Sequence, residues 1–329
     1  MEDFTQMRNR TLIKELRDFL IDKDSPNRNA LIDIFREHID KQEKSIALCF
    51  RGNYATFYYR CRMLLKLEFK NGEVVGSYDF NYAKAHPDRE TIRNILVGLG
   101  VIVTDSVKKP KCIIILSGKN RIFHDKLKEA IYIFIELIDG FKKLKKENDR
   151  QQQLYGSCFG NETVTYYDIE YTEPFETLLA CGYYDQVGTT LEDKRKAHRN
   201  HSAGKFDLLG LRRSENGYVL QLVELKSTIK ACTQRKAGVK AHFDDYTRYC
   251  KTPSLLDLRK IEAINAMALL SEILDEKHFA DDIEIDNLTT EIVFIFTDES
   301  VQVVDNYRAL LESENIKIIC YDENMNVIE

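Results

Sequence analysis

The chain has 329 residues, of which 43% are hydrophobic and 31% are charged, with only 15 Gly and 5 Pro. This composition is typical of a globular protein, and the length allows two domains. No apolar run approaches the roughly 18–20 residues that span a bilayer, and the acidic start, Met1-Glu2-Asp3-Phe4, lacks the apolar region of a secretory signal. Eight single cysteines, with no C-x-x-C pair, indicate reduced thiols. We therefore expect a cytoplasmic protein without a membrane partner.

The first half of the chain predicts an N-terminal α+β domain over residues 1–150. Helices are expected within residues 1–43, interrupted by a breaker at 24–27. Strands are predicted over residues 45–50, 54–60, 62–69 and 74–80, with Asn71-Gly72 as a hairpin turn. A helix over 88–97 stopped by Gly98, a strand over 112–116 and one long helix over about 120–149 complete the domain. A recognition or regulatory role is expected, which leaves room for an activating ligand or protein.

The second half predicts an α/β domain over residues 155–329. Strands are expected over residues 163–171, 205–212, 218–226, 291–297 and 316–321. Helices are expected over residues 239–250, 255–274 and 301–311. Strands that alternate with helices favour a mixed sheet flanked by helices.

Positive charge is concentrated in this second half, although the whole chain has a net charge of −5. Residues 194–251 contain 14 Lys and Arg against five Asp and Glu, a net charge of +9. This asymmetry indicates a polyanionic partner such as nucleic acid, and a solvated charged face is the alternative. The candidate phosphate contacts are Lys194, Arg195, Lys196, Arg199, Lys205, Lys230 and Lys236. For the cluster over 194–201 the alternative is a solvated loop, and His198 and His201 lack the further partners of a zinc site.

Two acids and a base stand at the ends of two apolar strands. Asp207 lies in the apolar run 206–211, and Glu224 and Lys226 end the apolar run 218–226. Because side chains alternate along a strand, Glu224 and Lys226 share one face about 7 Å apart. The hairpin that joins the runs brings Asp207 to the same place. Buried charges of this kind must be paired or bind a metal, and carboxylates with a backbone carbonyl suit Mg²⁺ or Mn²⁺.

The E-x-K pattern occurs three times in the chain, but only Glu224-Leu225-Lys226 ends an apolar strand beside a second acid-bearing strand. Here the sequence, over roughly residues 160–329, resembles the PD-(D/E)XK nuclease superfamily, with Phe206 in place of the Pro of the motif name. The resemblance implies a restriction-endonuclease-like fold in which Asp207, Glu224 and the carbonyl of Leu225 bind the metal and Lys226 orients the attacking water. It also implies a further acid upstream. Glu192 fits best by distance, and Glu176 and Glu170 are the alternatives.

These observations predict a Mg²⁺- or Mn²⁺-dependent endonuclease that cleaves DNA in preference to RNA, by analogy a restriction or antiphage defence effector. Enzymes of this fold often cut as homodimers. The alternatives are a metal-dependent endoribonuclease with the same residues and a nucleic-acid-binding protein that keeps the fold without catalysis. Gln234, His242 and Asp245 follow the motif, and a structural His242–Asp245 pair is one interpretation of the last two.

Overall fold

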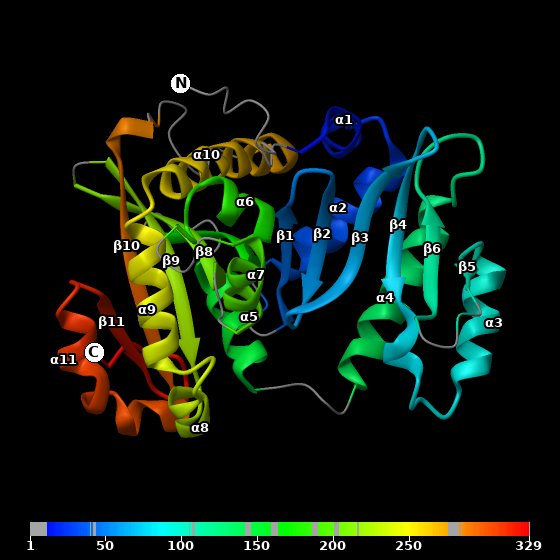
Figure 1. Ribbon diagram of the computed structural model, residues 1–329. Helices are drawn as coiled ribbons and strands as arrows, with labels where there is room; N and C mark the ends of the chain where they lie inside the picture. Colours follow the sequence, from blue (N-terminus) through cyan, green and yellow to red (C-terminus); the bar gives the residue numbers. More distant parts are fainter. Residues whose placement is uncertain are drawn as a thin grey trace. The chain divides into compact units, whose positions relative to one another are not determined.

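The computed structural model describes residues 12–39, 41, 44–104, 106, 109–141, 146–158, 164–185, 190–200, 204–215, 217–275, 283 and 285–328. The chain is α/β and divides into two compact units, each with its own sheet (Figure 1). Unit 2 comprises residues 10–159 and 266–279, and unit 1 comprises residues 1–9, 160–265 and 280–329. The boundary expected near residue 150 falls inside a helix of unit 2, which also takes a segment from the C-terminal half.

The sheet of unit 2 has six antiparallel strands in the order β1-β2-β3-β4-β6-β5. Their bounds are Ile46–Phe50, Tyr54–Tyr59, Arg62–Lys70, Glu73–Asp79, Ile102–Val103 and Lys111–Ile115 for β1 to β6. The predicted turn at Asn71-Gly72 is present, with both residues at positive φ. The short strand β5 was not predicted, since two residues carry too little periodicity.

Four helices of unit 2 accompany this sheet: α1 (Lys14–Ile21), α2 (Pro26–His38), α3 (Arg89–Leu99) and α4 (His124–Asp139). The predicted breaker starts α2, because the Ser25 hydroxyl caps the helix and Pro26 occupies its first turn. Aromatic pairs fasten helices to the sheet. Phe35 of α2 contacts Phe57 edge-on with centroids 6.3 Å apart, and Phe134 of α4 stacks on Tyr78 at 4.0 Å.

Two details of the predicted helices were wrong. Helix α3 passes through Gly98 and stops at Gly100, whose φ of 97° lies in the left-handed region that glycine tolerates best. The single long helix over 120–149 is instead α4, which ends at Asp139, and a separate helix α5 (Lys146–Cys158). The prediction followed the periodicity of the apolar residues, which continues past Gly140. Glycine and the polar residues after it disfavour a continuous helix at this place.

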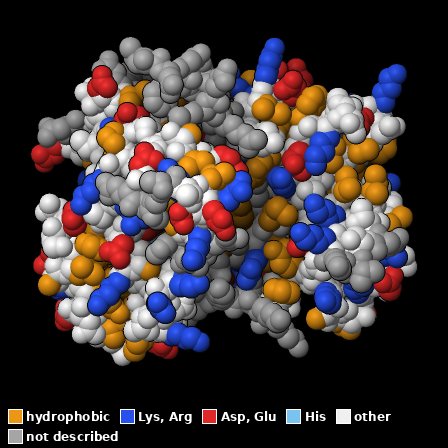
Figure 2. All heavy atoms as spheres, in the orientation of Figure 1, with side chains coloured by type: hydrophobic (Ala, Val, Ile, Leu, Met, Phe, Trp, Pro, Cys, Tyr) orange, Lys and Arg blue, Asp and Glu red, His pale blue; other side chains and the backbone are white. Residues whose placement is uncertain are grey.

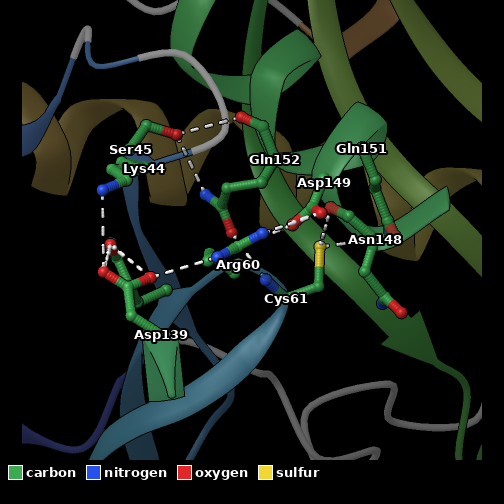
Figure 3. Close-up of polar contacts among 10 residues, drawn as sticks. Lys44, Ser45, Arg60, Cys61, Asp139, Asn148, Asp149, Gln151 and Gln152 are labelled. Carbon is green, nitrogen blue, oxygen red and sulfur yellow. Dashed lines mark hydrogen bonds and ion pairs between the residues drawn. The ribbon is translucent and has the colours of Figure 1, made fainter. Parts of the chain in front are cut away.

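Helix α5 belongs to unit 2 because its polar side chains bind the β2–β3 hairpin (Figure 3). Arg60, at positive φ in the hairpin turn, donates two parallel hydrogen bonds of 2.8 Å to the Asp149 carboxylate. Its third bond, of 3.1 Å, goes to Asp139 at the end of α4. The Gln152 side chain accepts from the Cys61 amide at 2.9 Å and donates to Ser45 at 3.1 Å. Gln152 and Asp149 therefore anchor helix α5 to the sheet of unit 2.

Unit 1 contains a five-stranded sheet in the order β11-β10-β9-β8-β7. The bounds of β7 to β11 are Val164–Thr172, Lys205–Ser214, Gly217–Lys226, Leu288–Thr297 and Lys317–Tyr321. Strand β8 is antiparallel to both neighbours, whereas β9, β10 and β11 run parallel. Strand β9 therefore lies in the middle of a mixed sheet, where both of its faces are buried.

Unit 1 contains the helices α6 (Phe175–Ala180), α7 (Leu191–Asn200), α8 (Ile229–Thr233), α9 (Val239–Cys250) and α11 (Asp305–Glu312). It also contains residues 253–265 of α10 (Pro253–Leu274), whose remaining residues belong to unit 2. Short helices α6 and α8 were not predicted. Residues 194–200, for which a solvated loop was the alternative, form part of helix α7. Helix α9 crosses one face of the sheet (Figure 1), where Tyr246 packs on Phe206 and Phe294 with centroids 4.8 and 5.8 Å away. Over the described residues, no helix combines the length and apolar character needed to cross a bilayer.

Candidate active site

The candidate site lies where strands β8 and β9 begin to separate. Their antiparallel ladder runs from Ser214↔Gly217 to Leu208↔Val223 and ends there. One position further on, Asp207 and Glu224 stand opposite each other. The Asp207 carboxylate accepts a hydrogen bond of 2.7 Å from the Leu225 amide, so that a side chain replaces the next rung of the ladder. Asp207 is partly exposed, and the site is therefore reached from solvent at this acid.

Glu224 and Lys226 form a buried ion pair on the same face of β9. Their side chains are only 3% and 4% exposed, and Lys226 Nζ contacts Glu224 Oε1. Between them, Leu225 points to the opposite face and is fully buried. The alternation predicted from the sequence is therefore present. The structure brings together all three predicted catalytic residues: the carboxylate of Asp207 faces the strand that carries the pair.

Two residues of helix α9 hold the Glu224 carboxylate from the other side. His242 Nε2 lies 3.2 Å from Oε1, and the Tyr246 hydroxyl lies 2.7 Å from Oε2. The same hydroxyl is 2.8 Å from the Lys205 carbonyl oxygen, and its single proton serves one acceptor at a time. The spacing of four residues places both side chains on one face of the helix. Tyr246 was missed by the sequence analysis, because a helical tyrosine has the pattern of a core residue.

The electrostatics keep this carboxylate ionised. Burial alone would raise the pKa of Glu224, but the neighbouring Lys226 ammonium and His242 outweigh it, and the net shift is downward. Burial lowers the pKa of His242, and the positive charges of Lys226 and Lys205 lower it further against the opposing effect of Glu224. A neutral His242 donates to Glu224 only in the tautomer protonated on Nε2. Burial and then the charge of Glu224 raise the pKa of Tyr246, which stays a neutral hydroxyl.

The predicted extra acid does not join this group. Glu192, Glu176 and Glu170 are all exposed, on α7, on α6 and near the end of β7. In the described part of the chain, no cluster of three or more His, Cys, Asp or Glu side chains has the arrangement of a metal site. Of the predicted acidic ligands, Asp207 and Glu224 occupy opposite positions on β8 and β9.

The predicted phosphate contacts occupy several elements. Lys205 begins β8 beside the site, and Lys230 and Lys236 are exposed on and after α8. On α7, Arg195 and Lys196 are exposed, Lys194 pairs with Asp185 at 2.9 Å, and the side chain of Arg199 lies outside the described residues. Figure 2 shows basic and acidic side chains interspersed on the face that it presents. The concentration of charge along the sequence therefore does not appear as one uniform basic patch on that face.

The interpretation of His242 also differs from the structure. The His242–Asp245 pair is wrong: His242 contacts Glu224, whereas Asp245 accepts hydrogen bonds from the Tyr183 hydroxyl and, at 2.9 Å, from the Gly204 amide. His198 bonds through Nδ1 to the Tyr184 hydroxyl at 2.8 Å, and His201 lies outside the described residues. The spacing of three residues places both side chains on the same side of α9, but the hydrogen bonds from Tyr183 and Gly204 engage Asp245.

Asp245 should make the stability of the protein depend on pH. Burial raises its pKa from the ordinary 3.8 to about 6, against the hydrogen bonds from Tyr183 and Gly204. The folded state therefore holds the Asp245 proton more tightly than the unfolded state does. The stability that the protonated Asp245 contributes is present below about pH 4 and is lost as the pH rises through about 6. As the pH is raised from 4 to 7, we expect the free energy of unfolding of Asp245→Asn to rise by about 2 kcal/mol relative to that of wild type, because asparagine has no proton to lose. Urea unfolding at both pH values checks this, and parallel pH profiles for the two proteins would contradict it.

Comparisons of the chain with protein-family models, with curated proteins and with solved structures find no match.

Proposed function

We propose that the protein is a metal-dependent endonuclease of the PD-(D/E)XK type that cleaves DNA. The observation that carries the proposal is the meeting of Asp207, Glu224 and Lys226 at the separating ends of two adjacent strands. The element order supports it. A strand with the first acid (β8) is followed by a strand with the second acid and the lysine (β9), by helices α8, α9 and α10, and by a strand parallel to β9 (β10). This agrees with the core order of strand, strand, helix and strand that the sequence resemblance implies.

The donor chemistry of the site suits a hard divalent cation. Two carboxylates lie at opposite positions of β8 and β9, one of them ionised by its surroundings and the other partly exposed to solvent. Mg²⁺ in phosphoryl-transfer sites commonly uses one or two carboxylates, with water and substrate phosphate in the remaining positions. Asp207, Glu224 and the carbonyl of Leu225 would hold Mg²⁺ or Mn²⁺. Such an ion acidifies bound water and neutralises charge on the phosphate.

The side chains around these acids have distinct tasks in phosphodiester hydrolysis. Lys226 places an ammonium beside Glu224, where it can hold the attacking water and offset negative charge that develops on the phosphorus oxygens. Tyr246 and His242 fix the Glu224 carboxylate, so that it needs little reorganisation during reaction. Lys205, exposed at the start of β8, is the nearest of the predicted phosphate contacts along the chain. The choice of DNA, a homodimeric state and a defence role rest on the resemblance and on analogy.

Cleavage assays with supercoiled plasmid, single-stranded DNA and structured RNA test the proposal. We expect plasmid nicking with Mg²⁺ or Mn²⁺ and none with EDTA. Asp207→Asn should lose at least about a hundredfold in rate, while its amide oxygen still accepts from the Leu225 amide and preserves the fold. Asp244→Asn, an exposed change on α9, is the matched control.

Each alternative has its own outcome. Metal-dependent cleavage of RNA with plasmid untouched would replace the proposal with an endoribonuclease. Binding of nucleic acid without cleavage, equal in wild type and Asp207→Asn, would indicate a non-catalytic binding protein.

A further inference from the structure

Unit 2 contains a basic pocket that the proposed nuclease site does not use. Its cavity has a volume of about 360 Å³ and lies between the first turns of α3 and the segment that joins β5 to β6. Among the described residues, the lining comprises Phe80, Asn81, Lys84, Arg89, Glu90, Arg93, Val103, Thr104, Ser106 and Pro110. Three cations and one acid give this lining a net charge of +2.

Backbone contacts hold the walls of the pocket in place. The Phe80 amide donates to the Pro110 carbonyl at 3.0 Å, which ties the end of β4 to the start of β6. The Thr104 amide donates to the Lys111 carbonyl at 2.8 Å, and the Thr104 hydroxyl accepts from the Lys111 amide at 2.9 Å. Phe80 is 1% exposed and forms the apolar floor, with the Arg89 guanidinium 5.5 Å from its ring centroid. These contacts fix the backbone on two sides of a half-open pocket.

The cations are only partly neutralised by the protein. Arg93 pairs with Glu90 at 3.7 Å. Arg89 Nε is enclosed by the fold and has no hydrogen-bond acceptor among the described residues. An enclosed donor of this kind normally has a partner, and a planar guanidinium donor is best matched by a phosphate or carboxylate oxygen.

We propose that this pocket binds a small phosphorylated ligand of mononucleotide size. Its volume lies at the lower end of the range for small-molecule sites, roughly 300–1,000 Å³. Arg89 and Lys84 hold the phosphate, and the side chains of Asn81, Thr104 and Ser106 offer hydrogen bonds to hydroxyl groups of the ligand. A small ligand is favoured over a nucleic-acid strand because the three cations line one half-open pocket and do not follow a groove. This assignment does not depend on the nuclease proposal.

Isothermal titration of the full chain with adenosine 5′-monophosphate, ribose 5-phosphate and adenosine tests the assignment. We expect saturable binding of at least one phosphorylated probe and none of adenosine. Arg89→Gln and Lys84→Gln should each weaken that binding about ten- to a hundredfold, the effect of losing one charge-assisted contact. Arg89→Lys, which keeps the charge without the planar donors, should fall between wild type and Arg89→Gln. Lys70→Gln, an exposed lysine paired with Glu68 on β3, is the control and should bind as wild type does.

Three results would overturn the assignment. The first is the absence of saturable binding of either phosphorylated probe at millimolar concentration. The second is equal binding by wild type, Arg89→Gln and Lys84→Gln. The third is Arg89-dependent binding of a 5′-phosphorylated oligonucleotide without binding of the small probes, which would make the pocket a receptor for nucleic-acid ends. Since the readout is heat of binding, loss of nuclease activity neither supports nor overturns it.

Discussion

Replacing Glu224 with Gln and Lys226 with Met together should give a folded protein that cleaves nucleic acid at least about a thousandfold more slowly than wild type. The two side chains form one ion pair, 3% and 4% exposed, in the central strand of unit 1. Removing both charges at once leaves no buried charge without a partner, so the free energy of unfolding should change by only about 1 kcal/mol. The site would nevertheless lose one carboxylate and the ammonium beside the scissile phosphate.

The single variants distinguish folding from chemistry. Glu224→Gln removes the carboxylate that pairs with the buried Lys226 ammonium, and Lys226→Met leaves the buried Glu224 carboxylate with Tyr246 and His242 but no ammonium. Each should lower the free energy of unfolding by about 3–5 kcal/mol. Guanidinium unfolding followed by tyrosine fluorescence suits a chain with 17 Tyr and no Trp. An active double variant would end the catalytic assignment of this pair, and an unstable double variant with stable singles would contradict the electrostatic account.

The second large effect is expected at Arg259, a fully buried residue of helix α10. Its Nε lies 3.3 Å from Glu173 Oε2, its Nη1 contacts Glu262, and its guanidinium lies over the Tyr171 ring at 4.7 Å. Tyr171 and Tyr249 also donate to Glu173, at 3.1 and 3.0 Å. We expect Arg259→Met to lower the free energy of unfolding by about 3–5 kcal/mol, because two buried carboxylates then lose their cation.

A surface arginine of the same unit provides the control. Arg308 on α11 is 31% exposed and pairs with the exposed Asp305 at 3.1 Å, so Arg308→Met should cost less than about 1 kcal/mol. Adding Glu173→Gln and Glu262→Gln to Arg259→Met should restore much of the lost stability. If Arg259→Met and Arg308→Met unfold at the same denaturant concentration, the buried cluster does not have the energetic role assigned to it.

Most of the secondary structure could be predicted because each element has its own periodic signal. The four strands β1 to β4, the β8–β9 hairpin, α9, α10 and β10 all lie within a few residues of their predicted positions. The failures have local causes. Segments as short as β5, α6 and α8 contain less than two periods of any pattern. Helix α5 was fused with α4 because an amphipathic pattern continued past Gly140, and only the contacts of Asp149 and Gln152 with the hairpin show that α5 is a separate element.

The sequence by itself determined that Glu224 and Lys226 share one face of a strand and that a second acid-bearing strand is their neighbour, since alternation and a short hairpin leave little freedom. Only the tertiary structure decided what surrounds these residues. Helix α9 lies 13 or more residues further along the chain, and no local pattern specifies that His242 and Tyr246 contact Glu224 and that Asp245 contacts Tyr183. The basic pocket likewise joins side chains from η3 (Phe80–Ala83), α3 and the β5–β6 segment. Such groupings arise from packing between elements, where burial energy outweighs the preferences of any single segment.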